Sequence, residues 1–480
     1  MQDPRLIERY LLLYIPWLLS LAFAYLPVLS FFVAWLGSFY IFYLTYSGRI
    51  KELPTDLPIA EQLMRPIFLV HVIFAGYMSV SPIFNLLDAL GWISFDDNDF
   101  PSSLEQLELI SQSQRYYCLG HAAYATGLLV YLKTRNEQFK VVITDLPSFL
   151  VRFTVVALIA SNAFLFIPGL KQFYFQLTAL SFIGATLALV FSFKADRIEY
   201  VAICGVLFII NLIQSLRSGF KEPVIINMLV LGIFLYPFYK KLVLAVFIPL
   251  MLVLFFLLPT YNQVFREKAW TKEEDVEQAS EAAMAALQAE DDGQQTTTTA
   301  WGFLTGRLSE VQMFTGYIEN TPSKNEFYGF TILWQSLEVI IPRAIWPSKP
   351  STEELVMERV YQAGVINRGS SVSAKPALIV DGYLSGGVAG IFLTCLIFGA
   401  FTQIISIKAE ELFGDYIIGT ALVYSGLFQI LWRGLSFEFL INSVVWSYIT
   451  MYIIFLILRL LNVLKKVDEL HSNIDETYSD

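Results

Sequence analysis

Long apolar stretches separated by short polar connections run along most of the chain. A stretch of about 17–25 apolar residues is long enough to cross a bilayer as a helix. About twelve such stretches occur, nine before one long polar segment and three after it, and Pro27 separates the first two because a proline ends a helix at the residue before it. They cover approximately residues 10–26, 28–46, 66–88, 116–132, 152–169, 174–193, 199–215, 223–239, 242–259, 383–404, 413–432 and 438–461. The pattern predicts an all-α polytopic integral membrane protein with about twelve transmembrane helices and one large external loop.

This spacing divides the chain into four regions. Residues 1–260 form a nine-helix transmembrane region, and residues 261–381 form the external loop with its interfacial helices. A three-helix transmembrane region follows at 382–462, and residues 463–480 form a cytoplasmic tail.

The composition supports a membrane protein and excludes some functions. Of the 480 residues, 56% are hydrophobic and only 15% are charged, whereas a soluble domain has about 25% charged residues. The net charge of −10 argues against nucleic acid as a partner, because binding it requires a basic face. Cys118, Cys204 and Cys395 lie in apolar segments and have neither disulfide nor metal-ligand spacing.

Lysines and arginines gather in alternate short loops, which orients the chain by the positive-inside rule. Both termini are then cytoplasmic and the long loop is external. Two external segments carry cations against the rule, the turn from Arg217 to Lys221 and the long loop itself. Headgroup contacts or internal ion pairs would explain single cations, but a group of them suggests a site for an anionic ligand.

The long loop begins with a segment that suggests no chemistry. Residues 271–292 are acidic and rich in alanine, with apolar side chains at helical spacing, so they predict a solvated helix. Residues 293–299 are of low complexity.

The next part of the loop suits a lipid surface. Residues 327–341 are apolar but interrupted, which predicts an interfacial helix on the outer leaflet with Trp334 and Trp346 at headgroup depth. Prolines flank Arg343 and Lys349 and stiffen the backbone that presents them. Arginine and lysine bind phosphate oxygens well, so this segment predicts binding of a lipid-linked phosphate.

Several of these motifs together resemble a known family. The run Arg307-Leu-Ser-Glu310, followed by Pro342-Arg343-x-x-Trp346-Pro347-x-Lys349-Pro350, is similar to the Wzy-type polymerases of O-antigen and other repeat-unit polysaccharides. Arg217-Ser-Gly resembles the arginine of their preceding periplasmic loop, and Arg433-Gly resembles their late Arg-Gly element. The likeness covers about residues 205–440. It departs at Asp381-Gly-Tyr383-Leu-Ser385, where related chains often have a Glu-x-Tyr-x-Asn-like element.

The resemblance implies a GT-C-like glycosyltransferase of a bacterial inner membrane. Such enzymes transfer a growing chain from undecaprenyl pyrophosphate to the next lipid-linked oligosaccharide at the periplasmic face. The implied partners are the undecaprenyl-pyrophosphate-linked oligosaccharide, the lipid bilayer and a candidate chain-length regulator, and no cofactor is expected.

The reaction requires cations for the departing pyrophosphate and a base for the attacking hydroxyl. The candidate catalytic residues are Arg343, Lys349, Arg307, Glu310, Arg217 and Arg433, and the candidate substrate-binding residues are Lys375, Arg368, Trp346, Lys221 and Asp381. Glu310 lies one helical turn beyond Arg307, so it is either a base or half of an ion pair.

Other readings of single residues stay open. Asp381 is either part of the site or a helix N-cap, and Glu222 and Glu438 are weaker candidates for the base. The acidic run at 96–99 is either an Mg²⁺ site or a solvated loop, and stabilisation without a metal is favoured. His71 and His121 lie within spans, where core histidines with satisfied hydrogen bonds are expected.

Two other functions remain open. An O-antigen ligase would share the fold and the arginine chemistry while using a different acceptor. A flippase or other transporter would suit twelve spans, but such proteins usually contain internal repeats, and the grouping of nine and three helices contains no evident repeat.

Overall fold

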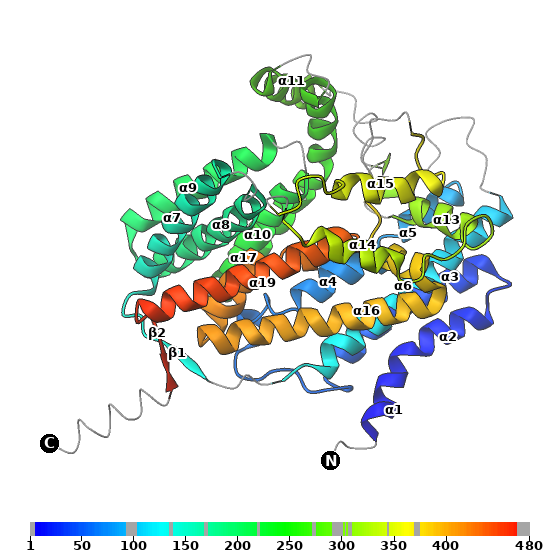
Figure 1. Ribbon diagram of the computed structural model, residues 1–480, viewed down its shortest axis with the longest axis horizontal. Coiled ribbons are helices and arrows are strands. Elements are labelled where there is room, and N and C mark those ends of the chain that lie inside the picture. The colour runs from blue at the N-terminus through cyan, green and yellow to red at the C-terminus, as the bar shows by residue number, and fades with distance from the viewer. Residues whose placement is uncertain are drawn as a thin grey trace. The chain divides into compact units, whose positions relative to one another are not determined.

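A computed structural model describes most of the chain as helix (Figure 1). The described residues are 5–92, 103–133, 138–167, 171–217, 221–270, 275–289, 301–302, 304–305, 310–342, 345–368 and 375–467. Within these ranges, 8 helices are long and apolar enough to cross a membrane: Pro27–Tyr46, Leu69–Ala89, Leu146–Leu165, Phe173–Lys194, Ile198–Arg217, Lys240–Ala269, Leu378–Phe413 and Phe437–Leu460. The chain is therefore a nearly all-α, membrane-embedded protein, as predicted, and the full count of twelve spans stays a prediction.

The helices form two compact units. The first unit comprises Met1–Leu57, Met64–Val142 and Thr305–Asp480, and the second comprises Pro58–Leu63 and Ile143–Leu304. The first unit thus joins the beginning of the chain to the second half of the long loop and to everything after it.

In the first unit, α6 is central and packs against α3 and α16. The elements before the loop are α1 (Arg5–Leu11), η1 (Leu12–Tyr14), α2 (Ile15–Ala22), α3 (Pro27–Tyr46), α4 (Leu69–Ala75), the π-helix η3 (Gly76–Val80), α5 (Ile83–Ala89), α6 (Leu104–Val130) and β1 (Phe139–Val141). Those from the loop onward are α13 (Val311–Asn320), α14 (Thr331–Val339), α15 (Thr352–Gln362), α16 (Leu378–Phe413), the π-helix η4 (Ile417–Tyr424), α17 (Ser425–Leu427), α18 (Ile430–Arg433), α19 (Phe437–Leu460) and β2 (Leu464–Lys466). β1 and β2 pair antiparallel.

Glycines allow α6 and α16 to touch through their backbones. A Cβ on Gly127 would lie 2.2 Å from the carbonyl oxygen of Leu396, and one on Gly399 would lie 2.2 Å from that of Tyr124. Small residues at such crossings are typical of helix pairs within membranes, where close packing holds helices together.

The helix α16 is a tight hairpin rather than one rod. Its backbone is non-helical at Gly386 and at Gly387, where φ is +60°, a value that favours glycine. A Cβ on Gly390 would lie 2.0 Å from the carbonyl oxygen of Gly382, although these residues would be about 12 Å apart along a straight helix. The arm that carries Asp381 therefore folds back against the arm that follows.

A buried ion-pair network holds another part of the first unit. Arg65 donates to Asp56 at 2.7 Å and to Glu410 of α16 at 2.8 Å, and Thr420 of η4 also donates to Glu410 at 2.8 Å. The side chain of Arg65 is buried with that of Glu410.

The second unit contains η2 (Ile59–Glu61), α7 (Leu146–Leu165), α8 (Lys171–Lys194), α9 (Ile198–Arg217), α10 (Lys221–Trp270) and α11 (Val276–Ala289). The long α10 bends at Tyr239, where the backbone is non-helical. The predicted acidic helix is confirmed as α11. Its Ala279 and Ala283 pack against Tyr261 and Phe265 of α10.

The crossing of α6 and α16 gives a stability prediction. We expect Gly399→Ala to lower the free energy of unfolding by about 1–3 kcal/mol, because its methyl group has no room and must push the helices apart. Gly205→Ala on α9 is the control, since its Cβ meets nothing within 4 Å. Thermal melting in detergent, followed by fluorescence-detected size exclusion, measures both. Equal melting of the two variants would contradict the prediction.

Candidate functional site

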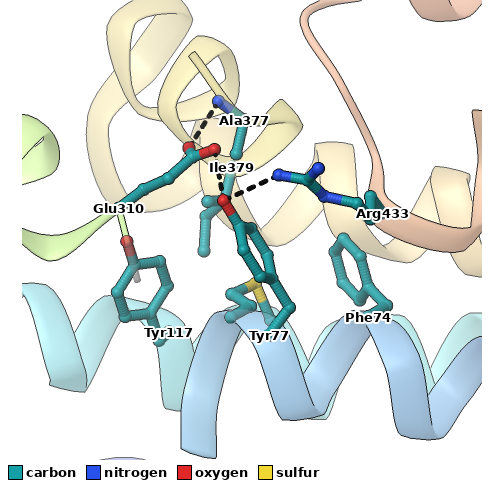
Figure 2. A pocket seen from close by; sticks show the side chains of 8 residues that line it. Phe74, Tyr77, Tyr117, Glu310, Ala377, Ile379 and Arg433 are labelled. Atoms are coloured by element: carbon teal, nitrogen blue, oxygen red, sulfur yellow. Dashed lines mark hydrogen bonds between the residues drawn. The ribbon is translucent and has the colours of Figure 1, made fainter. Parts of the chain in front are cut away.

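A small pocket in the first unit gathers residues from six elements or their ends (Figure 2). Its free volume is about 10 Å³, which is room for about one water molecule. The lining residues are Phe74, Tyr77, Met78, Tyr117, Glu310, Ala377, Ile379 and Arg433. They come from α4, η3, α6, the residue before α13, the start of α16 and the end of α18.

A chain of hydrogen bonds crosses this pocket, as Figure 2 shows. Arg433 Nη2 donates to the hydroxyl of Tyr77 at 2.9 Å, and that hydroxyl donates to Glu310 Oε1 at 2.8 Å. The backbone N–H of Ala377 donates to Glu310 Oε2 at 3.0 Å. The guanidinium carbon of Arg433 also lies 4.4 Å from the centre of the Tyr77 ring, a cation–π contact. One phenol thus connects a carboxylate to a guanidinium.

The pocket lies partway along membrane-spanning helices. Tyr77 is the ninth residue of the 21-residue span Leu69–Ala89 and belongs to the π-helix η3. Single π turns within helices are frequent at functional sites. Glu310 precedes α13 and Arg433 ends α18, and the side chains of both bond to Tyr77. Ionisable groups at such a level mark a functional site by default.

Local backbone structure fixes the position of Arg433. Gly434 follows α18 with φ of +70°, and a Cβ there would lie 2.9 Å from the ring of Phe74. The carbonyl of Gly434 accepts a hydrogen bond from Leu378 N–H at 2.9 Å, and Leu435 forms a β-bridge with Ala377. These contacts tie the end of α18 to the start of α16, and so hold Arg433 near Ala377 and its bond to Glu310.

A second charged cluster joins α15 to the starts of α16 and α19. The guanidinium of Arg359 donates to Glu438 Oε2 at 2.9 Å and to Glu438 Oε1, and lies 3.2 Å from Asp381 Oδ1. Asp381 Oδ2 accepts the backbone N–H of Phe437 at 2.8 Å. All three charged side chains are buried. Burial acts to lower the pKa of Arg359, but the charges of Asp381 and Glu438 outweigh it and raise that pKa.

The two clusters act on a common neighbour, Tyr317 of α13. Burial raises the pKa of the Tyr317 phenol, the charges of Asp381 and Glu310 raise it further, and Arg359 lowers it.

One family model matches the chain, over residues 15–466, and is described as a domain of unknown function, DUF8712. The chain belongs to this family. No curated protein and no solved structure matches the chain. The matched range of the DUF8712 domain includes both charged clusters.

The structure brings together some of the predicted site residues. Glu310 and Arg433 meet at the pocket, and Asp381 lies in the second cluster. Asp381 is not the N-cap of its helix, because Ala377 holds that position. The alternative reading of Glu310 as one half of an ion pair with Arg307 lies outside the described residues, as do Arg343 and the acidic run at 96–99.

Other predicted site residues have their own partners elsewhere. Lys349 donates to the carbonyls of Val339 and Ile341 at 2.8 and 2.6 Å. The backbone N–H of Trp346 donates to the carbonyl of Pro342 at 3.0 Å. Three cations form ion pairs: Arg217 with Glu277 at 3.4 Å in the second unit, Arg368 with Glu358 at 2.6 Å, and Lys375 with Glu353 at 3.4 Å. Lys221 begins α10, and its side chain lies outside the description.

Sequence reasoning missed Tyr77 and Arg359 and ranked Glu438 low. Arg359 lies in the acidic run Thr352–Gln362, which reads as a solvated helix. A signal was present, however: Asp381 and Glu438 both stand in the first turns of apolar spans. Two acids so placed require a cation from another segment.

The two histidines are buried, as predicted. His71 and His121 contact each other through Nε2 atoms 2.8 Å apart, and His71 Nδ1 lies 3.2 Å from the hydroxyl of Tyr46.

The described residues contain no group of three metal-binding side chains.

The second cluster predicts unequal effects of two substitutions. Arg359→Ala leaves two buried carboxylates without their cation, so we expect it to cost about 3–5 kcal/mol of stability. Glu438→Gln keeps Arg359 opposite Asp381 as a balanced pair, and we expect a smaller loss of about 1 kcal/mol. Thermal melting of the purified proteins in detergent measures both. Equal losses of stability in the two variants would contradict the role of Arg359 as the cation that balances both carboxylates.

Proposed function

We propose that this chain is a GT-C-like glycosyltransferase that polymerises the repeat units of a surface polysaccharide in a bacterial inner membrane. In this reaction the growing chain leaves undecaprenyl pyrophosphate and is transferred to the next lipid-linked repeat unit at the periplasmic face. The distribution of lysine and arginine between the short loops supports the required orientation, with both termini cytoplasmic and the long loop periplasmic.

The observation that carries the proposal is the meeting of Glu310 and Arg433 at one pocket among the spans. Both residues belong to the motifs that resemble the polysaccharide polymerases, yet they are far apart in sequence. Glycosyl transfer from a pyrophosphate requires a proton acceptor and a cation. A carboxylate and a guanidinium that share one phenol supply both groups.

The chemistry assigns one role to each group. The acceptor hydroxyl oxygen bonds to the anomeric carbon of the donor, and the bond from that carbon to the pyrophosphate oxygen breaks. Glu310 takes the hydroxyl proton as general base. The pyrophosphate leaves with the bonding electrons, and Arg433 stabilises its charge through hydrogen bonds. Tyr77 holds the two side chains in position.

A sugar does not fit the pocket in this conformation, which has room for about one water molecule. Glu310 precedes α13 and Ala377 precedes α16, so both belong to connections between helices. We propose that these connections separate when the substrate binds. Lys349 bonds to the end of α14 instead, so charge stabilisation is assigned to Arg433.

The test uses a strain deleted for this gene and complemented with variants. We expect Glu310→Gln to lower polymer formation at least about 100-fold, because general bases contribute roughly 10²–10⁴ to rate. The polysaccharide ladder on a gel would then collapse to a single repeat unit. We expect Arg433→Lys, which loses the planar fork, to give the same result. Glu319→Gln is the matched control, because Glu319 is exposed on α13, the helix that Glu310 precedes, and it should restore the ladder.

Protein levels in the membrane must be equal for all variants. Polymer that accumulates on its carrier in the deleted strain, with no attached glycan, would indicate a ligase in place of a polymerase. An intact ladder in the deleted strain would refute the transferase proposal.

A further inference from the structure

The helix α14 has two different apolar faces. Ile332, Ser336 and Val339 are buried on one face, which packs against α19 and α16. The opposite face is exposed, with Phe330 at 75% and Trp334 at 65% of their full exposure. Its members follow helical spacing and are Phe330, Leu333, Trp334, Leu337 and Ile341. The polar residues Thr331, Gln335 and Glu338 fall together on one flank, so they do not interrupt this apolar face.

α14 lies along the sides of the spans rather than across their ends (Figure 1). Before the helix, Tyr328 N–H donates to the carbonyl of Leu384 on the first arm of α16 at 2.8 Å. At its other end, Trp446 Nε1 donates to the carbonyl of Ile340 at 3.1 Å. Trp446 is nine residues beyond the start of α19, or about 13 Å along that helix. α14 therefore occupies the same level as the first part of a membrane span.

The neighbouring helix α19, against which α14 packs, also exposes apolar side chains. Tyr448, Ile449, Tyr452 and Ile453 of α19 are also exposed, on a helix that is long and apolar enough to cross the bilayer. Exposed apolar side chains on two helices that pack together mark an interaction with lipid or with another protein.

The end of α14 is independently suited to surroundings without water. The last carbonyls of a helix have no partner within it and usually bond to solvent. Here Val339 and Ile341 accept from Lys349 Nζ, and Ile340 accepts from Trp446. Three successive carbonyls thus each receive a side-chain donor. In hydrocarbon every backbone polar group must find such a partner.

We infer that the exposed face of α14 is inserted among the lipid acyl chains of one leaflet. The segment between α13 and α15 enters the membrane beside α16 and α19 and returns on the same side. Ile345, at 77% exposure between Pro342 and Pro347, lies on the returning part. Trp334 is then in hydrocarbon, deeper than the headgroup position predicted from the sequence. The inference does not depend on the proposed reaction.

The test measures the depth of spin labels on the full-length protein in phosphatidylcholine–phosphatidylglycerol vesicles. Cys118, Cys204 and Cys395 are buried and are replaced by alanine, and single cysteines are introduced by Trp334→Cys and, independently, Leu337→Cys. Both positions are exposed, so the substitutions remove few internal contacts. Ile453→Cys on α19 is the lipid reference and Lys324→Cys, in an exposed turn, is the water reference.

Collision with oxygen, which concentrates in hydrocarbon, is compared with collision with a water-soluble nickel chelate. We expect labels at 334 and 337 to behave like the label at 453, with high oxygen access and at least about tenfold less nickel access than at 324. Nickel access equal to that at 324 would place the helix in water and overturn the inference. Low access of both reagents to the labels would show that protein covers this face, and would overturn the inference. Dipolar broadening between labels would do the same, and would identify the covering protein as a second copy of this chain.

Discussion

The lack of water among membrane-spanning helices is the constraint on which the rest of this structure depends. A charge or carbonyl in such surroundings must find its partner within the protein. Arg359 accordingly meets two acids from different helices, and Arg65 meets Glu410 and Asp56. Each of these contacts fixes a connecting segment to a span. The absence of water, which makes a buried charge costly, therefore also holds the connecting segments in place.

Close backbone packing provides the second condition for the site. Glycines on α6 and α16 let the two helices touch, and the break at Gly386 and Gly387 folds α16 back on itself. The first arm of α16 then presents Ala377 and Asp381 to segments that come from the long loop. The N–H of Ala377 there donates to Glu310 Oε2 at 3.0 Å.

The pocket and the buried cluster differ in what they can do. Arg359 is enclosed by carboxylates and holds α15 to α16 and α19, which suits a structural role. Arg433 and Glu310 are linked through a hydroxyl beside a small space, and the acceptor in the proposed reaction also offers a hydroxyl. This difference is the reason for assigning the chemistry to the pocket and the stability to the cluster.

The sequence by itself determined the membrane-embedded helical class and the acidic helix α11, and it singled out Glu310 and Arg433 as candidates, because hydropathy and short motifs are local properties. It did not reveal Tyr77 or Arg359, nor that Lys349 caps α14. A tyrosine within a span and an arginine within an acidic helix look ordinary until their neighbours are known. Only the tertiary structure decided which charges meet, because the partners come from segments distant in sequence and are selected by packing and by the absence of water.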